Sequence, residues 1–320
     1  MNRASMSPRR IVIFCDLEFP AMSVLPDPSL WETDDEYHEQ HKFEEHHGYR
    51  GLHGHHEGDQ NDDREKDNER YEHDGERIHD EHCNAREHLE HHELRIIGAA
   101  ELAEVLEELT ANDCFVNLHA PYFPKSAWTA IVAYLHRGGN WLNVGGAPFK
   151  RPVRQEGEQW IIEAEQTAYH QELYIHEALK VSTSKVATMS ASKDIPLLAG
   201  QEELLELTDT WNLVPHTTRS SDLPHQMGSA GPMSTHIYPL LTGVSEDGRS
   251  LAAMAVLWEY SRGVFTGSRW MFVHVPLTAS FWEKGGAVAL LGWASFCANG
   301  VTELSLKPNY ASYEPEERAV

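Results

Sequence analysis

Short apolar runs alternate with amphipathic segments along the chain, and this alternation is its main structural signal. Residues 11–15 (IVIFC) form a continuous apolar run with a charged residue on either side, which is typical of a strand that is buried on both faces. A second run at 94–97 is followed by Leu and Val at helical spacing over residues 102–109. The regular pattern therefore opens with two strands, and the second strand leads into a helix.

The same unit then repeats. Residues 113–118 (DCFVNL) predict a buried strand, residues 126–136 a helix that stops at Gly138 and Gly139, and residues 141–144 the next strand. Strands that alternate with helices form right-handed crossovers between parallel strands. We therefore expect an α/β fold, with a flavodoxin-like parallel sheet and helices on both of its faces.

After this repeat the pattern becomes less regular. It predicts a hairpin, a helix, a long loop or lid, two late strands of which the first is antiparallel, and a closing helix. We expect these elements at residues 153–162, 169–179, 209–239, 251–258, 270–275 and 287–297, respectively.

A long acidic segment interrupts the pattern between residues 32 and 93. It contains 22 Asp and Glu residues against 7 Lys and Arg residues, and only nine of its 62 residues are apolar or aromatic. A segment of this composition cannot bury enough apolar surface to offset the entropy that folding removes. We expect a disordered His-rich and acid-rich insertion in a single domain made of residues 1–31 and 94–300.

The last twenty residues, 301–320, have a different character. Apolar residues alternate at their start, and two prolines follow. One interpretation is that a β-sandwich of a longer polypeptide begins here, and the other is that the segment is a linker or a frayed tail.

Charge and cysteine content exclude several classes of partner. The formal net charge is −24 and Lys and Arg are not clustered, which argues against nucleic acid and against an anionic membrane surface as partners. The apolar stretch near the amino terminus spans only about five residues, too short for a secretory signal. The four cysteines show no C-x-x-C spacing, which suits free thiols in a reducing compartment. We expect a soluble cytoplasmic protein.

Polar residues and glycines follow three of the predicted strands. In an open parallel sheet the ligand lies outside the carboxyl ends of the strands, near the point where the strand order reverses. The chain has no glycine-rich phosphate-binding motif, so we expect a neutral polyol or sugar there rather than a nucleotide. Each residue also has a structural explanation, as a turn, a cap or a loop contact. The candidate ligand-binding residues are Asp16 and Glu18 after the first strand, His119 and Tyr122 after the third, and Asn143, Gly145 and Gly146 after the fourth.

The stretch DCFVNLHAPYFPKSAWTAIVAYLHRGGNWLNVGGAPF, residues 113–149, resembles the strand, helix, Gly-Gly and strand of class I glutamine amidotransferase-like domains. The resemblance is closest to the non-amidotransferase branch, which includes ThuA-like proteins and accessory domains of bacterial β-galactosidases. Amidotransferases of this class carry a cysteine nucleophile on a G-x-C-x-G turn and a later His-x-Glu pair. Here residues 143–147 read NVGGA, and His274 is followed by Val275 and Pro276, so the resemblance implies no glutaminase activity.

What the resemblance implies is a catalytically silent domain that binds a ligand or forms an oligomer, within a carbohydrate-active, glycoside hydrolase-like protein. The residues leave an alternative open, a small hydrolase that uses the acids Asp16 and Glu18 with a more distant carboxylate. We assign no catalytic residue and require no cofactor. The distant acids considered are Glu172, Glu177 and Glu259.

Thirteen of the chain's 21 histidines lie between His38 and His92. Neutral imidazoles beside carboxylates coordinate Zn²⁺ or Ni²⁺. We expect weak binding of these metals by the insertion, with a solvated spacer or a metal buffer as alternatives. If residues 76–94 form a helix, one modest site would use His79, Cys83, His88 and His92.

Overall fold

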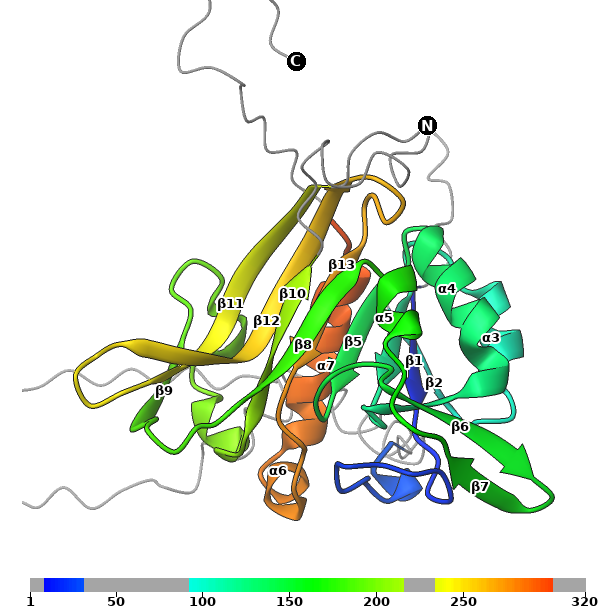
Figure 1. The fold of residues 1–320 in the computed structure, drawn as a ribbon, viewed down its shortest axis with the longest axis horizontal. Coiled ribbons are helices and arrows are strands. Elements are labelled where there is room, and N and C mark those ends of the chain that lie inside the picture. The colour runs from blue at the N-terminus through cyan, green and yellow to red at the C-terminus, as the bar shows by residue number, and fades with distance from the viewer. Residues whose placement is uncertain (1–8, 32–91, 216–233, 302–320) are drawn as a thin grey trace, which may run out of the picture. The chain divides into compact units, whose positions relative to one another are not determined.

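The computed structural model describes residues 9–31, 92–215 and 234–301 (Figure 1). The chain divides into two compact units, one made of residues 27–83 and the other of the remaining residues. In the smaller unit the described residues form one short 3-10 helix, η1 (Pro28–Trp31), at whose start the Asp27 carboxylate accepts a hydrogen bond from the Ser29 N–H (2.9 Å). The expected insertion and tail lie outside the described residues, apart from His92, Glu93 and Val301.

An eight-stranded sheet forms the centre of the larger unit, in the order β2-β1-β3-β5-β13-β12-β11-β9 (Figure 1). The first five strands of this order are parallel, and the last three pair antiparallel. The expected α/β class with a mostly parallel sheet is therefore confirmed, and so is the antiparallel direction of the late strand at 251–258. In sheet order the strands are β2 (His92–Ile97), β1 (Arg9–Phe14), β3 (Cys114–Asn117), β5 (Asn140–Val144), β13 (Arg269–Val273), β12 (Ser250–Arg262), β11 (Ser234–Val244) and β9 (Thr188–Ala191).

The two faces of this sheet pack against different helices, because successive strand residues point to opposite sides. Val12 and Phe14 of β1 belong to a core cluster that also contains the apolar residues of α3 and α4. Ile11 and Ile13 are completely buried but lie outside this cluster, and α7 packs against β1, β3, β5 and β13. The closing helix expected at 287–297 is thus confirmed. The helices are α3 (Leu102–Glu108), α4 (Trp128–His136), α5 (Ala168–Glu172), α6 (Ala279–Glu283) and α7 (Gly286–Ala298).

Two smaller sheets decorate the central one. The predicted hairpin at 153–162 is confirmed, as β6 and β7 pair antiparallel and β6 also pairs in parallel with β4. A second pair consists of β8 and β10, which are antiparallel. These strands are β4 (Tyr122–Pro124), β6 (Arg151–Glu156), β7 (Gln159–Ile162), β8 (Ile175–Val181) and β10 (Thr210–Pro215), and three short 3-10 helices complete the unit: η2 (Lys125–Ala127), η3 (Pro196–Leu198) and η4 (Glu202–Leu204).

Two expected elements differ from those observed. The helix expected at 169–179 is wrong beyond Glu172, because Tyr174 adopts a left-handed backbone conformation (φ 55°) that ends the helix, and β8 follows. The loop or lid expected at 209–239 is wrong at both ends, which form β10 and the start of β11. In both cases pairing with a distant strand decides the structure.

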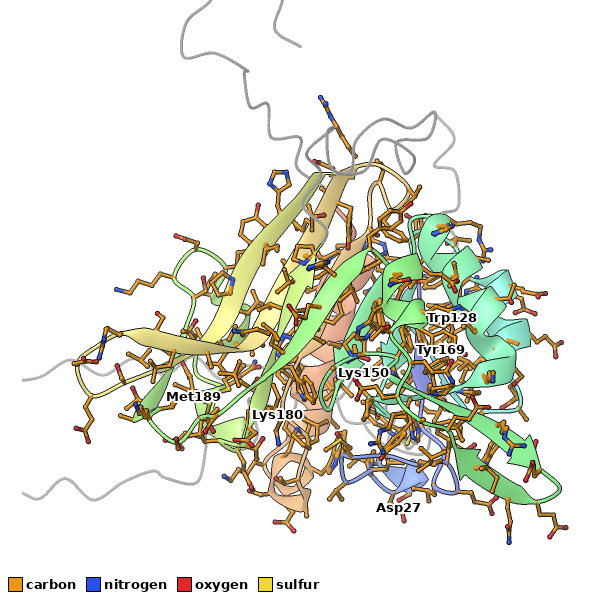
Figure 2. All side chains as sticks on the ribbon, in the orientation of Figure 1. Asp27, Trp128, Lys150, Tyr169, Lys180 and Met189 are labelled. Carbon is orange, nitrogen blue, oxygen red and sulfur yellow. The ribbon has the colours of Figure 1, made fainter. Side chains whose placement is uncertain are left out.

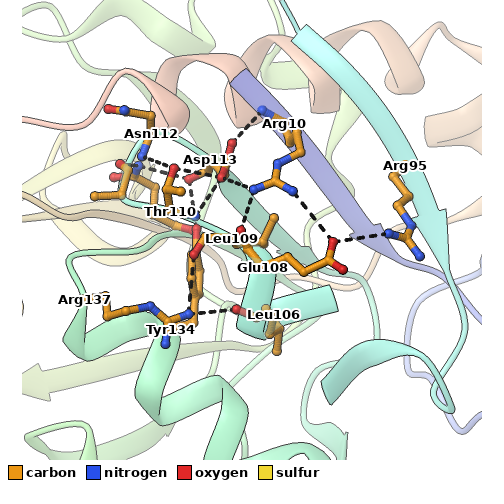
Figure 3. Close-up of polar contacts among 12 residues, drawn as sticks. Arg10, Arg95, Leu106, Glu108, Leu109, Thr110, Asn112, Asp113, Tyr134 and Arg137 are labelled. Atoms are coloured by element: carbon orange, nitrogen blue, oxygen red, sulfur yellow. Dashed lines mark hydrogen bonds and ion pairs between the residues drawn. The ribbon is translucent and has the colours of Figure 1, made fainter. Parts of the chain in front are cut away.

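A buried carboxylate fixes the amino-terminal ends of β1 and β3 (Figure 3). Asp113 is only 2% exposed. Its Oδ1 accepts a hydrogen bond from the Arg10 N–H (2.8 Å), and its Oδ2 accepts from Arg10 Nη2 (3.0 Å) and from the Thr110 N–H (2.7 Å). Burial opposes ionisation, but the hydrogen bonds from Arg10 and Thr110 outweigh it and lower the pKa of Asp113 below its ordinary value.

Candidate functional site

A cleft of about 970 Å³ opens over the carboxyl ends of β1 and β2. One wall is the loop after β1, the second is the turn after β2, and the third is the β6–β7 hairpin. Two of the candidate ligand-binding residues, Asp16 and Glu18, line this cleft. The lining residues are Asp16, Glu18, Phe19 and Pro20 from the first wall, residues 98–100 from the second, and Gln155, Glu158, Gln159 and Trp160 from the third.

The Asp16 carboxylate joins the first two walls. Its Oδ2 accepts a hydrogen bond from the Ala99 N–H (2.9 Å), and its Oδ1 accepts one from the Glu18 N–H (3.0 Å). A Cβ atom on Gly98 would lie 3.3 Å from the same Oδ2, so glycine suits this close approach. A carboxylate has about four acceptor positions, which leaves Asp16 acceptor capacity toward the cleft.

His119, which follows β3, packs against the end of β1 and the loop after it, and does not line the cleft. Its ring is completely buried, between Phe14 (centroids 4.1 Å apart) and the edge of Phe19 (5.2 Å). Nε2 accepts the Asp16 N–H (3.0 Å), and Nδ1 lies 3.0 Å from the Pro20 carbonyl oxygen, to which it donates in this arrangement. Burial lowers the pKa of His119 to about 4. The ring is therefore a neutral cross-link of the loop, and the expected role in ligand binding is replaced by a structural one.

Both polar groups of the Asn143 side chain are also hydrogen-bonded within the protein. Its Oδ1 accepts a hydrogen bond from Asn117 Nδ2 (3.1 Å), and its Nδ2 donates to the Gly146 carbonyl (3.1 Å). Asn117 in turn accepts the His119 N–H (3.0 Å). This buried chain of amides connects the ends of β3 and β5. Tyr122, half-buried in β4, packs against the hydrophobic core, and neither Tyr122 nor Asn143 lines the cleft.

Gly145 and Gly146 are required by space and by backbone conformation. Their φ angles are 105° and 132°, and a Cβ on Gly145 would lie 2.8 Å from Ser23 Oγ, while one on Gly146 would lie 3.2 Å from Trp211 Nε1. Lys150, labelled in Figure 2, lies with its Nζ 4.4 Å from the Trp211 ring centroid. The two glycines therefore allow close packing of the segment after β5, and they too lie outside the cleft.

The hairpin wall was not found by the sequence reasoning. The residues Gln155, Glu158, Gln159 and Trp160 were assigned to a hairpin only. Alternation in the sequence predicts that two strands pair, but it does not say over which part of the sheet their turn lies. The parallel pairing of β6 with β4, with Tyr122 opposite Arg151, brings the hairpin to the cleft.

Neither Cys15 nor Cys114 is an activated nucleophile. Cys15, at the end of β1, is half-buried, and its burial and the nearby Asp16 charge raise the pKa of its thiol to about 11. Cys114 is completely buried in β3, as the sequence predicted, and burial raises its pKa as well. A nucleophilic cysteine needs the thiolate form, so both thiols are poor nucleophiles at neutral pH.

His274 follows β13 and faces the protein interior, away from the cleft. It is 1% exposed, and neither ring nitrogen has a hydrogen-bond partner among the described residues. Burial lowers its pKa to about 3. A neutral buried imidazole without partners is a cost to stability rather than a ligand contact.

The structure corrects one part of the expected metal site. His92 is the first residue of β2, and its Nε2 lies 3.4 Å from Ser295 Oγ, so the condition for this site, a helix over 76–94, is not met at residues 92–94. His79, Cys83 and His88 lie outside the described residues. Within the described ranges, no group of three or more His, Cys, Asp or Glu side chains is placed to hold a metal ion.

Comparison of the chain with models of known protein families found no match. Comparison with curated proteins found no match either. In the part of the chain that the structure describes, every helix is too short or too polar to cross a membrane.

Proposed function

We propose that this chain contains a flavodoxin-like, amidotransferase-like domain that lacks glutaminase chemistry and binds a carbohydrate or polyol in the cleft over β1 and β2. The order of the parallel strands supports the fold assignment. Numbered along the chain, the five parallel strands have the order 2-1-3-4-5, which is the order of flavodoxin-like sheets.

The shape and lining of the cleft carry the functional proposal. Its hairpin wall presents Trp160, half-buried with its ring edge-on to Phe19 (centroids 5.0 Å apart). Carboxylates and amides lie around it, among them Asp16 and Gln159. A sugar has an apolar face that packs on an aromatic ring and a rim of hydroxyls that hydrogen-bond to such groups. A single cleft therefore offers both kinds of contact.

The same lining disfavours a nucleotide. Among the described lining residues, the charged side chains are Asp16, Glu18 and Glu158, and carboxylates repel phosphate. The Glu101 carboxylate lies 3.4 Å from the Gly98 nitrogen, at the turn before α3. A phosphate would compete with that carboxylate for the backbone donor.

The absence of glutaminase chemistry is supported at two positions. The turn after β5, where an amidotransferase of the resembled class has its cysteine, contains Gly145 and Gly146, tightly packed against Ser23 and Trp211. Cys15 directly precedes Asp16, which lines the cleft, and the raised pKa of the Cys15 thiol keeps it protonated at neutral pH. Changing Cys15→Ser should therefore leave any ammonia release from glutamine at background level.

The resemblance also supplies the setting. We place the domain in a larger cytoplasmic, glycoside hydrolase-like protein, where it would bind a sugar or contribute contacts to a homo-oligomer. Light scattering of the purified chain measures the oligomeric state directly, and a strictly monomeric chain would remove the oligomer from this proposal.

Titration calorimetry with neutral oligosaccharides and with nucleotides tests the binding function. We expect an oligosaccharide to bind and Trp160→Ala to weaken its binding by about fivefold to thirtyfold, since an aromatic contact of this kind is worth about 1–2 kcal/mol. The matched control is Trp282→Ala, because Trp282 is also half-buried but donates to the Val24 carbonyl outside the cleft. Tight nucleotide binding, or sugar binding insensitive to Trp160→Ala, would contradict the proposal.

One observation favours a second function, glycoside hydrolysis. The hairpin brings Glu158 to the cleft that Asp16 and Glu18 line, and glycosidases use two carboxylates on either side of the sugar. The distant acids Glu172, Glu177 and Glu259 do not line the cleft. Glu172 accepts a hydrogen bond from Trp128 Nε1, and Glu259 forms an ion pair with Arg269. Release of reducing sugar from oligosaccharides, abolished by Glu158→Gln, would establish hydrolysis. Bound but intact oligosaccharide would leave binding as the function.

A further inference from the structure

The charges of the cleft point to a more specific ligand, and this inference rests on the proposed sugar-binding function. We propose that the cleft selects saccharides that carry a free, protonated amine over neutral saccharides, and neutral saccharides over acidic ones. This refines the expectation of a neutral ligand that the sequence alone supports.

The first argument is that every charged side chain of the lining, on the first and third walls, is acidic. Asp16 and Glu18 come from the loop after β1, and Glu158 comes from the turn of the β6–β7 hairpin on another wall. No Lys or Arg is found among the described residues that line the cleft. A cleft with charges of one sign on separate walls concentrates the opposite charge between them.

Two basic side chains at or near the hairpin form ion pairs outside the cleft. Arg154 of β6 forms ion pairs with Glu156 and Glu163, and Lys125 pairs with Glu163 (2.8 Å). Arg95 of β2 pairs with Glu101 (3.6 Å), which lies in the turn before α3. Among the described residues, none of the three carboxylates of the cleft forms an ion pair.

The second argument is that one of the carboxylates is held in place before any ligand binds. Two backbone N–H groups fix Asp16, through Ala99 on one oxygen and Glu18 on the other. A ligand that binds such a group does not have to order it, so less conformational entropy is lost. An ammonium group has three donors and no acceptor, and it therefore matches an anchored carboxylate better than a hydroxyl does.

The third argument is the aromatic wall. Trp160 is half-buried and packs on Phe19, so its indole is held at the cleft rather than free to rotate away. An indole ring attracts a cation over its face and also packs against the apolar face of a sugar ring. Gln155 and Gln159 stand on the same hairpin, where their amides can hydrogen-bond to hydroxyls. An amino sugar uses all three kinds of group at once.

A divalent cation does not explain the carboxylates equally well. Among the described residues, no three acidic, His or Cys side chains converge closely enough to hold a metal ion, and Ca²⁺ needs six to eight oxygen ligands. Separated carboxylates around an aromatic wall suit an extended organic cation.

The experiment compares three β-1,4-linked trisaccharides on the full chain by titration calorimetry: the trimers of glucosamine, of N-acetylglucosamine and of glucose. We expect the glucosamine trimer to bind about tenfold more tightly than the other two at low salt, and the difference to shrink strongly in about 1 M NaCl, where charges are screened within about 3 Å. Cellotriose carrying a terminal uronic acid should bind more weakly than cellotriose itself.

A charge-removing variant tests the assignment of the carboxylates. Glu18→Gln combined with Glu158→Gln should weaken binding of the glucosamine trimer more than binding of the uncharged glucose trimer, and so reduce the amine preference to about twofold or less. The matched control is Glu246→Gln combined with Asp247→Asn, at the exposed turn between β11 and β12, which should keep the full preference.

The outcomes separate the two proposals. Equal affinity for the three trimers, or an amine preference that survives the Glu18 and Glu158 changes, overturns the selectivity while sugar binding stands. An amine preference that the control variant also loses overturns it too, since the effect would then come from net charge. Failure of every trimer to bind, in a chain whose thermal melt is cooperative, overturns the proposed function itself.

Discussion

The backbone N–H of Asp16 donates a hydrogen bond to Nε2 of His119 across 103 residues of sequence, at 3.0 Å. His119 thus holds the loop after β1 through the backbone of Asp16. The Asp16 side chain in turn accepts a hydrogen bond from the Ala99 N–H, in the turn after β2. Asp16 is thus fixed by three hydrogen bonds, through its N–H, its Oδ1 and its Oδ2, and its carboxylate keeps further acceptor capacity for a ligand. The buried imidazole is therefore a positioning residue for the cleft.

Replacement of His119 should weaken both the fold and the site. His119→Ala removes the acceptor of the Asp16 N–H and leaves a cavity beneath Phe14 and Phe19, so we expect a loss of about 3 kcal/mol in the free energy of unfolding. Urea denaturation measures it. His236→Ala is the control, because this half-buried histidine on β11 makes one long contact with Ser261 (3.2 Å) and should cost under about 1 kcal/mol. Equal losses in the two variants would contradict the structural role of His119.

The same residue predicts how stability depends on pH. The pKa of His119 falls from 6.5 to about 4 on folding because the ring is buried. The unfolded chain therefore binds a proton at a pH where the folded chain does not, and stability decreases as pH falls from about 6.5 to about 4. Burial of His274, with its pKa near 3, extends the decrease to lower pH. His119→Phe should reduce the change of the urea midpoint between pH 6.5 and pH 4. An unchanged pH dependence of the midpoint would argue against the neutral, buried ring.

Two glycines should respond oppositely to alanine. Gly145→Ala places a Cβ 2.8 Å from Ser23 Oγ at a φ of 105°, so we expect a loss of about 2–4 kcal/mol in stability. At Gly292, in α7, a Cβ meets nothing within 4 Å, and Gly292→Ala should be neutral or stabilise the fold by up to about 1 kcal/mol. Thermal melts of the two variants make the comparison. A neutral Gly145→Ala would show that the segment after β5 is packed more loosely than described.

The Asp113 carboxylate should matter far more than an exposed one. Asp113→Asn leaves Arg10 and the Thr110 backbone with a neutral, poorer acceptor in a buried position, and we expect a loss of about 2–3 kcal/mol at pH 7. Since the pKa of Asp113 is lowered in the folded state, this contribution is present above about pH 4 and disappears as the carboxylate protonates, so the wild type and the variant should converge in acid. Asp247→Asn, in an exposed turn, is the control and should change stability by less than about 0.5 kcal/mol.

The histidine-rich segment can be tested apart from the fold. A peptide spanning residues 38–92 should bind Zn²⁺ in several weak events, in the micromolar range, without one cooperative folding step, because its few apolar residues provide no core to hold ligands. Binding should fade as pH falls through about 6.5, where imidazole protonates. A single stoichiometric nanomolar site, seen by calorimetry together with a gain of circular dichroism signal, would contradict this expectation.

The sequence by itself determined the class of fold and singled out Asp16 and Glu18, two of the four residues in the first wall of the cleft. A continuous apolar run such as residues 11–15 predicts a buried strand from the local sequence alone, because a strand buried on both faces must be apolar throughout. A polar residue directly after such a run, such as Asp16, lies at the end of its strand wherever that strand sits in the sheet. The glycines Gly145 and Gly146 were visible too, but a glycine in the sequence does not say whether it opens space for a ligand or for Ser23 and Trp211.

Only the tertiary structure decided which polar groups are already used by the protein and which reach the cleft. His119 and Asn143 looked available because hydrogen-bond partners such as the Pro20 carbonyl and Asn117 are distant or unmarked in the sequence. Trp160 and Glu158 were missed for the converse reason, since alternation fixes a hairpin but the pairing of β6 with β4 fixes its place. Pairing between segments far apart in the chain also places residues 175–179, the end of the helix expected at 169–179, in a strand beside β10. The local sequence pattern indicates which side chains are buried. Pairing between distant segments determines which residues those side chains pack against, and the chemistry of the cleft depends on these partners.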